Sequence, residues 1–157
     1  MPRTTSSPVR RRLWSLATGE LASVVVLPWV AYGLIGLPLS PANLLGTVLA
    51  LVILLQGSAY WLLKLHRPAN PAGMGVYAVL RRLNPVLLGL ALPVLVVALV
   101  TGPFDEVVAG LAFWVLAVLE QVNYFHTQLM YDTAADRRRL RVSGLQPAHL
   151  GRDIARR

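Results

Sequence analysis

The chain has 157 residues, of which 55% are hydrophobic and only 14% charged, and its net charge at pH 7 is +8. Soluble domains average about 25% charged residues, so this composition excludes a disordered chain and indicates a single integral membrane domain. There is no Cys, which excludes disulfides, thiolate nucleophiles and zinc sites ligated by Cys.

Four segments are long and apolar enough to cross a bilayer, whose core of about 30 Å takes about 20 helical residues. Because lipid offers no hydrogen bonds to the backbone, each segment is expected to be an α-helix. We predict transmembrane helices over residues 13–37, 43–65, 76–100 and 106–131. The connections are short and rich in Pro and Gly, which favours an all-α, up-down four-helix bundle.

Proline and small residues within these segments predict how the helices bend and pack. Pro28 and Pro93 lie in the middle of the first and third helices, where kinks are expected. Helices in membranes associate through small residues that let their backbones approach closely. The candidates are Ala22, Gly46, Gly89, Ala91, Gly110 and Ala117.

The basic residues predict the topology. All 15 Lys and Arg residues lie before the first helix, around the middle loop or after the fourth helix. The other two connections carry no basic residue, and Asp105 and Glu106 mark the second of them. The positive-inside rule therefore places both termini and the middle loop in the cytoplasm, with basic tails over residues 1–12 and 132–157.

The same charges suggest a location and partners. An excess of 14 Arg over one Lys is typical of a GC-rich bacterial genome, so the expected location is the bacterial cytoplasmic membrane. No nucleic-acid recognition motif accompanies the charge, and no nucleic-acid partner is expected. The basic residues either attract anionic lipid headgroups at the cytoplasmic face or serve topology alone. A homo-oligomer and membership of a larger membrane complex are both open.

The basic tail after the fourth helix contains signals for further local structure. Residues 133–136 have the form of a capping box, and Pro147 is suited to the first position of a short final helix. Leu145, Leu150 and Ile154 then form an amphipathic face that lies on the membrane surface. A solvated tail is the alternative.

Strong polar side chains gather in the cytoplasmic halves of the helices, whereas the outer halves are almost free of them. On the fourth helix, Glu120, Asn123, Tyr124, Thr127 and Tyr131 have the spacing of one helical face. A charge at membrane depth costs at least a few kcal/mol unless it faces the bundle interior, so the polar faces should meet. The candidate ligand-binding residues are Glu20, Gln56, Tyr60, Arg81, Asn84, Glu120, Asn123, Tyr124, His126 and Tyr131.

Three functions fit such a cluster. It can form a cavity open to the cytoplasm that binds a lipid-like or anionic amphipathic ligand, with Arg81 holding the anionic group. It can instead be a structural network that fixes helix register in an accessory or scaffold subunit. The third possibility is an oligomeric ion or proton channel or transporter, in which conduction runs between copies because the apolar outer half seals each monomer.

Catalytic motifs are missing from the sequence, so whether the protein is an enzyme stays open. It has no HExxH or GxSxG motif and no phosphate-binding glycine loop. Glu120 and His126 are six residues apart, which does not suit two metal ligands on one helical face. We therefore assign no catalytic residue, no metal site and no cofactor.

Four stretches together are similar to a known group of proteins. They are GSAYWLLKL at the end of the second helix, LRRLN in the third, LEQVNYFHTQLMYD in the fourth and GLQPAHLGRDIARR near the C-terminus. This combination resembles a family of small four-helix bacterial integral membrane proteins without an established activity. The resemblance covers the last two thirds of the chain and implies the four-helix architecture, but no reaction, cofactor or substrate.

Overall fold

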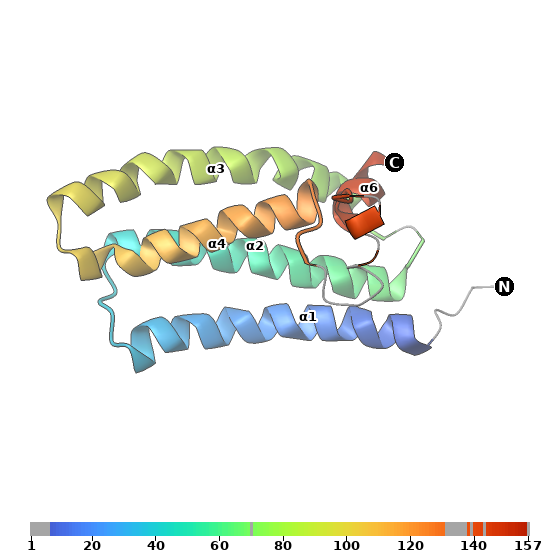
Figure 1. Cartoon of the computed structure of the whole chain (residues 1–157), viewed down its shortest axis with the longest axis horizontal. Helices are drawn as coiled ribbons and strands as arrows, with labels where there is room; N and C mark the ends of the chain where they lie inside the picture. Colours follow the sequence, from blue (N-terminus) through green and yellow to red (C-terminus); the bar gives the residue numbers. More distant parts are fainter. Residues whose placement is uncertain (1–6, 70, 131–137, 139, 143, 157) are drawn as a thin grey trace.

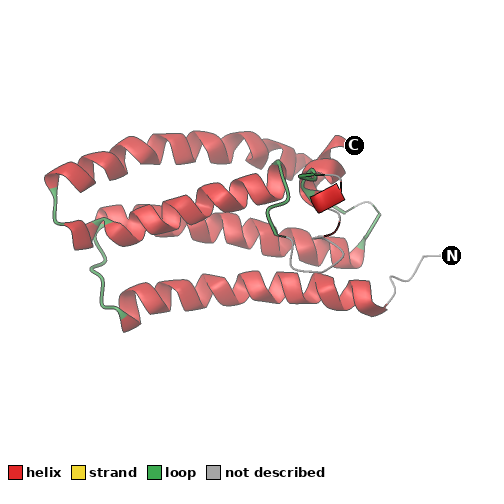
Figure 2. Ribbon diagram, in the orientation of Figure 1, coloured by secondary structure: helices red, strands yellow, loops and turns green. Residues whose placement is uncertain are grey.

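The computed structural model describes residues 7–69, 71–130, 138, 140–142 and 144–156, and its long elements are all helical (Figure 2). These are α1 (Ser7–Pro28), which continues as the π-helical segment η1 (Trp29–Leu34), α2 (Pro41–His66), α3 (Met74–Thr101), the 3-10 turn η2 (Phe104–Glu106), α4 (Val108–Phe125) and α6 (His149–Ala155).

Four helical stretches have the length and hydropathy of membrane spans, which confirms the prediction of a multi-pass membrane protein. They are Pro8–Leu34, Pro41–His66, Met74–Thr101 and Phe104–Phe125. Their outward-facing side chains are apolar, as Val25, Leu90 and Val100 illustrate, each being more than 60% exposed. An apolar exterior of this extent suits contact with lipid rather than water.

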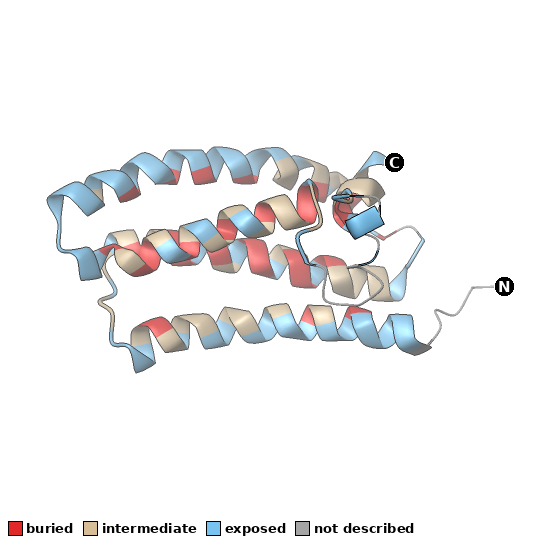
Figure 3. Ribbon diagram, in the orientation of Figure 1, coloured by how far each residue is buried: buried red, intermediate tan, exposed pale blue. Residues whose placement is uncertain are grey.

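The four long helices run antiparallel, and the start of α1 and the whole of α6 lie at the same end of the bundle (Figure 1). α2 is central and packs against α1, α3 and α4, whereas α1 packs mainly against α2. Figure 3 shows buried residues concentrated along α2 and α4 and exposed outer faces on α1 and α3. We call the end where α1 starts the basic end, because the described basic residues lie there: Arg10, Arg11, Arg12, Lys64, Arg67, Arg81, Arg82, Arg138, Arg141, Arg152 and Arg156.

Small residues produce the closest helix contact, which lies between α2 and α4. A Cβ atom on Gly46 would lie only 1.9 Å from the carbonyl oxygen of Gly110, so only glycine fits at that position. The predicted packing role is thus confirmed for Gly46 and Gly110, and Ala91 and Ala117 are also buried. It is wrong for Gly89 and Ala22, which are exposed on the outer faces of α3 and α1.

The prolines lie where the helices depart from regular geometry. After Pro28 the backbone widens into η1, in which the Ile35 N–H donates to Val30 O at 2.9 Å, five residues back. Pro93 lies within α3, which is visibly bowed along its length (Figure 1). Proline removes one helical hydrogen bond and crowds the preceding turn, which accounts for local irregularity.

The end of the bundle opposite the basic end is tied together by Asn43, which is fully buried. Its side-chain amide donates to the carbonyl oxygens of Pro38 (2.9 Å) and Asp105 (2.8 Å) and accepts from the Gly110 N–H at 2.9 Å. One side chain therefore joins both loops at this end to α4. Asn43 was not among the predicted residues, because this half of the bundle was expected to be almost free of polar groups.

α4 is shorter than predicted, because it ends at Phe125 rather than continuing to residue 131. Beyond it, residues 126–128 pair with residues 146–148: Gln128 N–H donates to Gln146 O at 2.9 Å, and Ala148 N–H donates to His126 O at 3.1 Å. Thr127 is therefore not part of a helical face with Glu120. Tyr131 and the capping-box sequence at 133–136 lie outside the described residues.

α6 begins two residues after Pro147, because Ala148 has an extended backbone (ψ 146°) and is the N-cap residue, while its N–H donates to His126 O. The expectation that Leu150 lies on the membrane surface is wrong, since its side chain is 1% exposed and belongs to the buried core. Ile154 packs against the same core, whereas Leu145 is exposed. α6 is thus docked on the basic ends of α3 and α4 and is not a solvated tail.

Candidate functional site

The structure divides the predicted polar cluster into two separate groups. The first, which we call the amide triad, joins three helices: Gln56 on α2, Asn84 on α3 and Gln121 on α4. The Asn84 amide nitrogen donates to Gln56 Oε1 at 2.8 Å and to Gln121 Oε1 at 2.9 Å. The Tyr77 hydroxyl donates to the Gln56 carbonyl at 2.9 Å, and Gln121 Nε2 donates weakly to the Arg81 carbonyl at 3.4 Å.

The amide triad is closed and internally satisfied. Asn84 and Gln121 are 3% and 4% exposed, and buried amides that bond one another fix the register of the helices that carry them. Gln121 was not among the candidate residues. The signal for it was the buried stripe of α4, since Gln121 follows Phe113 and Ala117 at successive four-residue steps.

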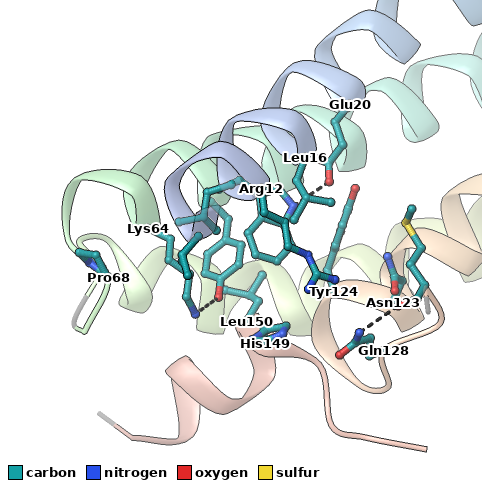
Figure 4. Close-up of a pocket in the computed structure, with 15 residues that line it drawn as sticks. Arg12, Leu16, Glu20, Lys64, Pro68, Asn123, Tyr124, Gln128, His149 and Leu150 are labelled. Atoms are coloured by element: carbon teal, nitrogen blue, oxygen red, sulfur yellow. Dashed lines mark hydrogen bonds between the residues drawn. The ribbon is translucent and has the colours of Figure 1, made fainter. Parts of the chain in front are cut away.

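The second group surrounds a cavity of about 400 Å³ at the basic end, which we call the basic-end pocket (Figure 4). Four of the predicted residues line it: Glu20, Tyr60, Asn123 and Tyr124. The other lining residues are mostly apolar or aromatic: Val9, Leu13, Leu16, Trp61, Pro68, Met130 and Leu150. Four are basic or polar: Arg12, Lys64, Gln128 and His149. We call the end of the pocket at Glu20 its deep end, and the end at Arg12 and Lys64 its mouth.

α1 supplies one complete wall of the pocket through helical periodicity. Val9, Leu13, Leu16 and Glu20 follow one another at steps of four, three and four residues, which places them on one face. The facing walls come from the basic ends of α2 and α4 and from α6. Residues far apart in sequence are therefore brought to one cavity by short loops and by docking of α6.

The deep end of the pocket is polar and incompletely hydrogen-bonded. Trp61 Nε1 donates to Glu20 Oε1 at 2.8 Å. Glu20 Oε2 and the Tyr124 hydroxyl are both buried, yet neither has a hydrogen-bond partner among the described residues. Buried polar atoms are nearly always paired in native proteins, so two atoms without partners, one on α1 and one on α4, distinguish this end of the pocket.

Glycine on α2 makes room for these two oxygens. A Cβ atom on Gly57 would lie 2.3 Å from Glu20 Oε2 and 2.5 Å from the Tyr124 hydroxyl oxygen. The two atoms therefore converge on the same spot without the geometry of a mutual hydrogen bond.

At the mouth, α6 is fastened to α2 through Asp153, in a group that we call the α6 latch. Asp153 Oδ2 accepts from the Tyr60 hydroxyl at 2.6 Å and from Lys64 Nζ at 2.5 Å. Lys64 also donates to the Tyr60 hydroxyl at 2.8 Å. The Lys64 and Asp153 side chains are only 16% and 7% exposed, so this ion pair is shielded from water.

His149 lies beside the α6 latch, with its ring edge-on to Trp61 at 6.1 Å between centroids. Partial burial, together with the positive charges of Arg152 and Lys64, lowers the pKa of His149 to about 4. The imidazole is therefore neutral at neutral pH, when its Nδ1 can accept the hydrogen bond that Arg152 makes at 3.0 Å.

Three other predicted residues, Glu120, Arg81 and His126, do not line the pocket. The Glu120 carboxylate is nevertheless close enough to act on Tyr124. Glu120 accepts a hydrogen bond from the Asn123 amide at 3.3 Å. Arg81 and His126 line a separate hollow of about 340 Å³, bounded by α3 and by Ile154 of α6. Arg81 is thus not brought to the deep end of the pocket beside Glu20.

The described residues contain no group of three metal-ligating side chains. Comparison with known proteins adds no further constraint, because the chain matches no family model, no curated protein and no solved structure. The family resemblance of the four sequence stretches therefore stays a prediction, and the four-span architecture rests on the helices themselves.

Proposed function

We propose that this multi-pass membrane protein binds a lipid-like, amphipathic ligand in the basic-end pocket. The observation that carries the proposal is an apolar-walled cavity of about 400 Å³ whose deep end holds two unpaired buried polar atoms. Ligand sites are typically concave, mostly apolar and about 300–1,000 Å³ in volume, with a few polar groups that orient the ligand.

The walls favour an alkyl or other apolar body. Leu13 and Leu16 of α1, Trp61 of α2 and Leu150 of α6 all line the cavity. A ligand that displaces water from these surfaces gains about 25 cal/mol for each Å² of apolar area that it covers. Because α1 packs mainly against α2, we propose that the ligand enters from the bilayer between α1 and α4.

The charges around the mouth support a site at the cytoplasmic leaflet of a bacterial membrane. Arg12 and Lys64 line the pocket, and most other basic residues lie at the same end. Basic residues near an anionic surface contribute about 1 kcal/mol each to lipid attraction. The positive-inside rule orients this end toward the cytoplasm.

The proposal is tested by purifying the full chain in a mild detergent and identifying retained small molecules by native mass spectrometry and lipid extraction. Leu16→Trp fills the pocket, and Leu21→Trp is its matched control on the exposed face of the same helix. We expect a stoichiometric amphiphile on the wild-type protein and on Leu21→Trp, and its loss from Leu16→Trp. Identical bulk lipid on all three proteins would refute the proposal.

A second function, that of an accessory or scaffold subunit, is favoured by the amide triad. A closed polar network that fixes helix register serves rigidity rather than ligand exchange. Under this proposal the bundle is held in a homo-oligomer or in a larger membrane complex. Native mass spectrometry discriminates the two functions, because a scaffold retains protein partners at fixed stoichiometry and no specific amphiphile.

A further inference from the structure

We infer that the deep end of the basic-end pocket binds a hydrogen-bond-donating group, an ammonium or a hydroxyl, carried on an apolar chain. Glu20 and Tyr124 are the residues that bind it. The inference rests on the proposed function, since it names the chemistry of the ligand that occupies this pocket.

Two buried oxygens at the deep end of the pocket lack hydrogen-bond partners among the described residues. One carboxyl oxygen of Glu20 already accepts from Trp61 Nε1, and the other, Oε2, has no partner among the described residues. A carboxylate oxygen only accepts hydrogen bonds, so its missing partner is a donor. The Tyr124 hydroxyl, which is 4% exposed as a residue, is unpaired beside it.

These two oxygens also converge beside Gly57 of α2. Because Gly57 has no side chain, Glu20 Oε2 and the Tyr124 hydroxyl both approach the point where its Cβ would be, within 2.5 Å. A single ammonium has three donors and can satisfy both oxygens at once, whereas a hydroxyl can donate to one and accept from the other. An anionic group at this place would meet the carboxylate and be repelled.

Along α1, two polar residues line the pocket, and apolar residues lie between them. Glu20 is eight residues from Arg12 on α1, which corresponds to about 12 Å along the helix axis. Leu13 and Leu16 lie between them on the same wall. The pocket thus accommodates an apolar chain with its donor group buried at Glu20 and its other end near the mouth.

The test uses the full chain in nanodiscs and the displacement of a fluorescent single-chain amphiphile by dodecylamine, dodecanol and dodecanoate. These competitors share one chain length and differ in the head group. The variants are Glu20→Gln and Tyr124→Phe, with Glu106→Gln as the matched control, because Glu106 is an exposed carboxylate in η2, at the opposite end of the bundle from the pocket. Circular dichroism and gel filtration check that each variant folds.

We expect the amine and the alcohol to displace the probe at concentrations about tenfold lower than dodecanoate, as one charge-assisted hydrogen bond provides. Glu20→Gln should abolish the preference for the amine, Tyr124→Phe should weaken it, and Glu106→Gln should leave it unchanged. Equal binding of all three amphiphiles, unaffected by Glu20→Gln and Tyr124→Phe, would overturn the inference and leave the proposed function standing. Failure of the probe to bind the wild-type protein would overturn both.

Discussion

Replacing Gly46 with Ala tests whether the contact between α2 and α4 determines the packing of the bundle. The new Cβ would lie 1.9 Å from the carbonyl oxygen of Gly110 and 2.7 Å from its Cα. Ordinary contact begins at 3.4 Å, so the two backbones must separate by roughly 1.5 Å, and no rotamer change can relieve a clash with backbone atoms.

The free energy of unfolding should fall by about 2–6 kcal/mol, the sum of two contributions. Overpacking of a well-packed interior costs about 1–3 kcal/mol. Separation of the helices also strains the buried hydrogen bond from Gly110 N–H to Asn43 Oδ1, now 2.9 Å long. Loss of a buried hydrogen bond leaves an unsatisfied group at a cost of about 1–3 kcal/mol.

Unfolding by sodium dodecyl sulfate in mixed micelles, followed by circular dichroism, measures this difference. Gly19→Ala is the matched control, because a Cβ on Gly19 meets no atom within 4 Å. Since Ala has the higher helix propensity, that variant should equal the wild type or exceed it by up to about 1 kcal/mol. A Gly46→Ala protein as stable as the wild type would refute the close approach of α2 and α4.

Three further predictions concern the two ends of the bundle. Asp153→Asn removes one partner of the shielded ion pair with Lys64 and should weaken docking of α6 by about 3–5 kcal/mol. Hydrogen exchange over residues 149–155 should become faster, and unchanged protection would contradict the prediction. Docking should also weaken as pH falls, because the pKa of His149 is about 4 when docked against an ordinary 6.5, so the released form takes up the proton first. The stabilisation of α6 docking by neutral His149 is complete above pH 6.5 and is lost as the pH approaches 4. His149→Gln should remove this part of the pH dependence. The variant retains the surrounding charged groups, Lys64, Arg152, Arg12 and Asp153. Asn43→Ala should lower thermal stability by about 1–3 kcal/mol, since it leaves Gly110 N–H and two loop carbonyls unpaired; an unchanged melting temperature would count against the role of Asn43.

The spans were predictable because hydropathy is a local property of the sequence. The second and third helices were expected over residues 43–65 and 76–100 and are observed over Pro41–His66 and Met74–Thr101. The end of α4 was not predictable, because it depends on pairing of residues 126–128 with residues about twenty positions later. A hydropathy window placed over the fourth helix does not include residues 146–148, so it carries no information about where the helix ends.

The candidate site was predictable in composition but not in grouping. Periodicity identified the depth of Glu20, Gln56, Asn84 and Tyr124, yet successive helical residues differ by about 100° in direction. A modest rotation of one helix therefore decides which neighbour a side chain meets. Gln56 and Asn84 turn toward Gln121 in the amide triad, whereas Glu20 and Tyr124 converge over Gly57, and only the assembled helices determine this division.

The basic-end pocket is built from opposite extremes of the polypeptide, Val9 on α1 and Leu150 on α6. During synthesis the first wall enters the membrane early, whereas α6 is translated after all four spans. The nascent protein therefore passes through a stage in which the cavity is open on the side that α6 later covers. Under the proposed function, a lipid of the host membrane has access to the site at that stage, before α6 docks, so it would bind during biogenesis and be retained afterwards.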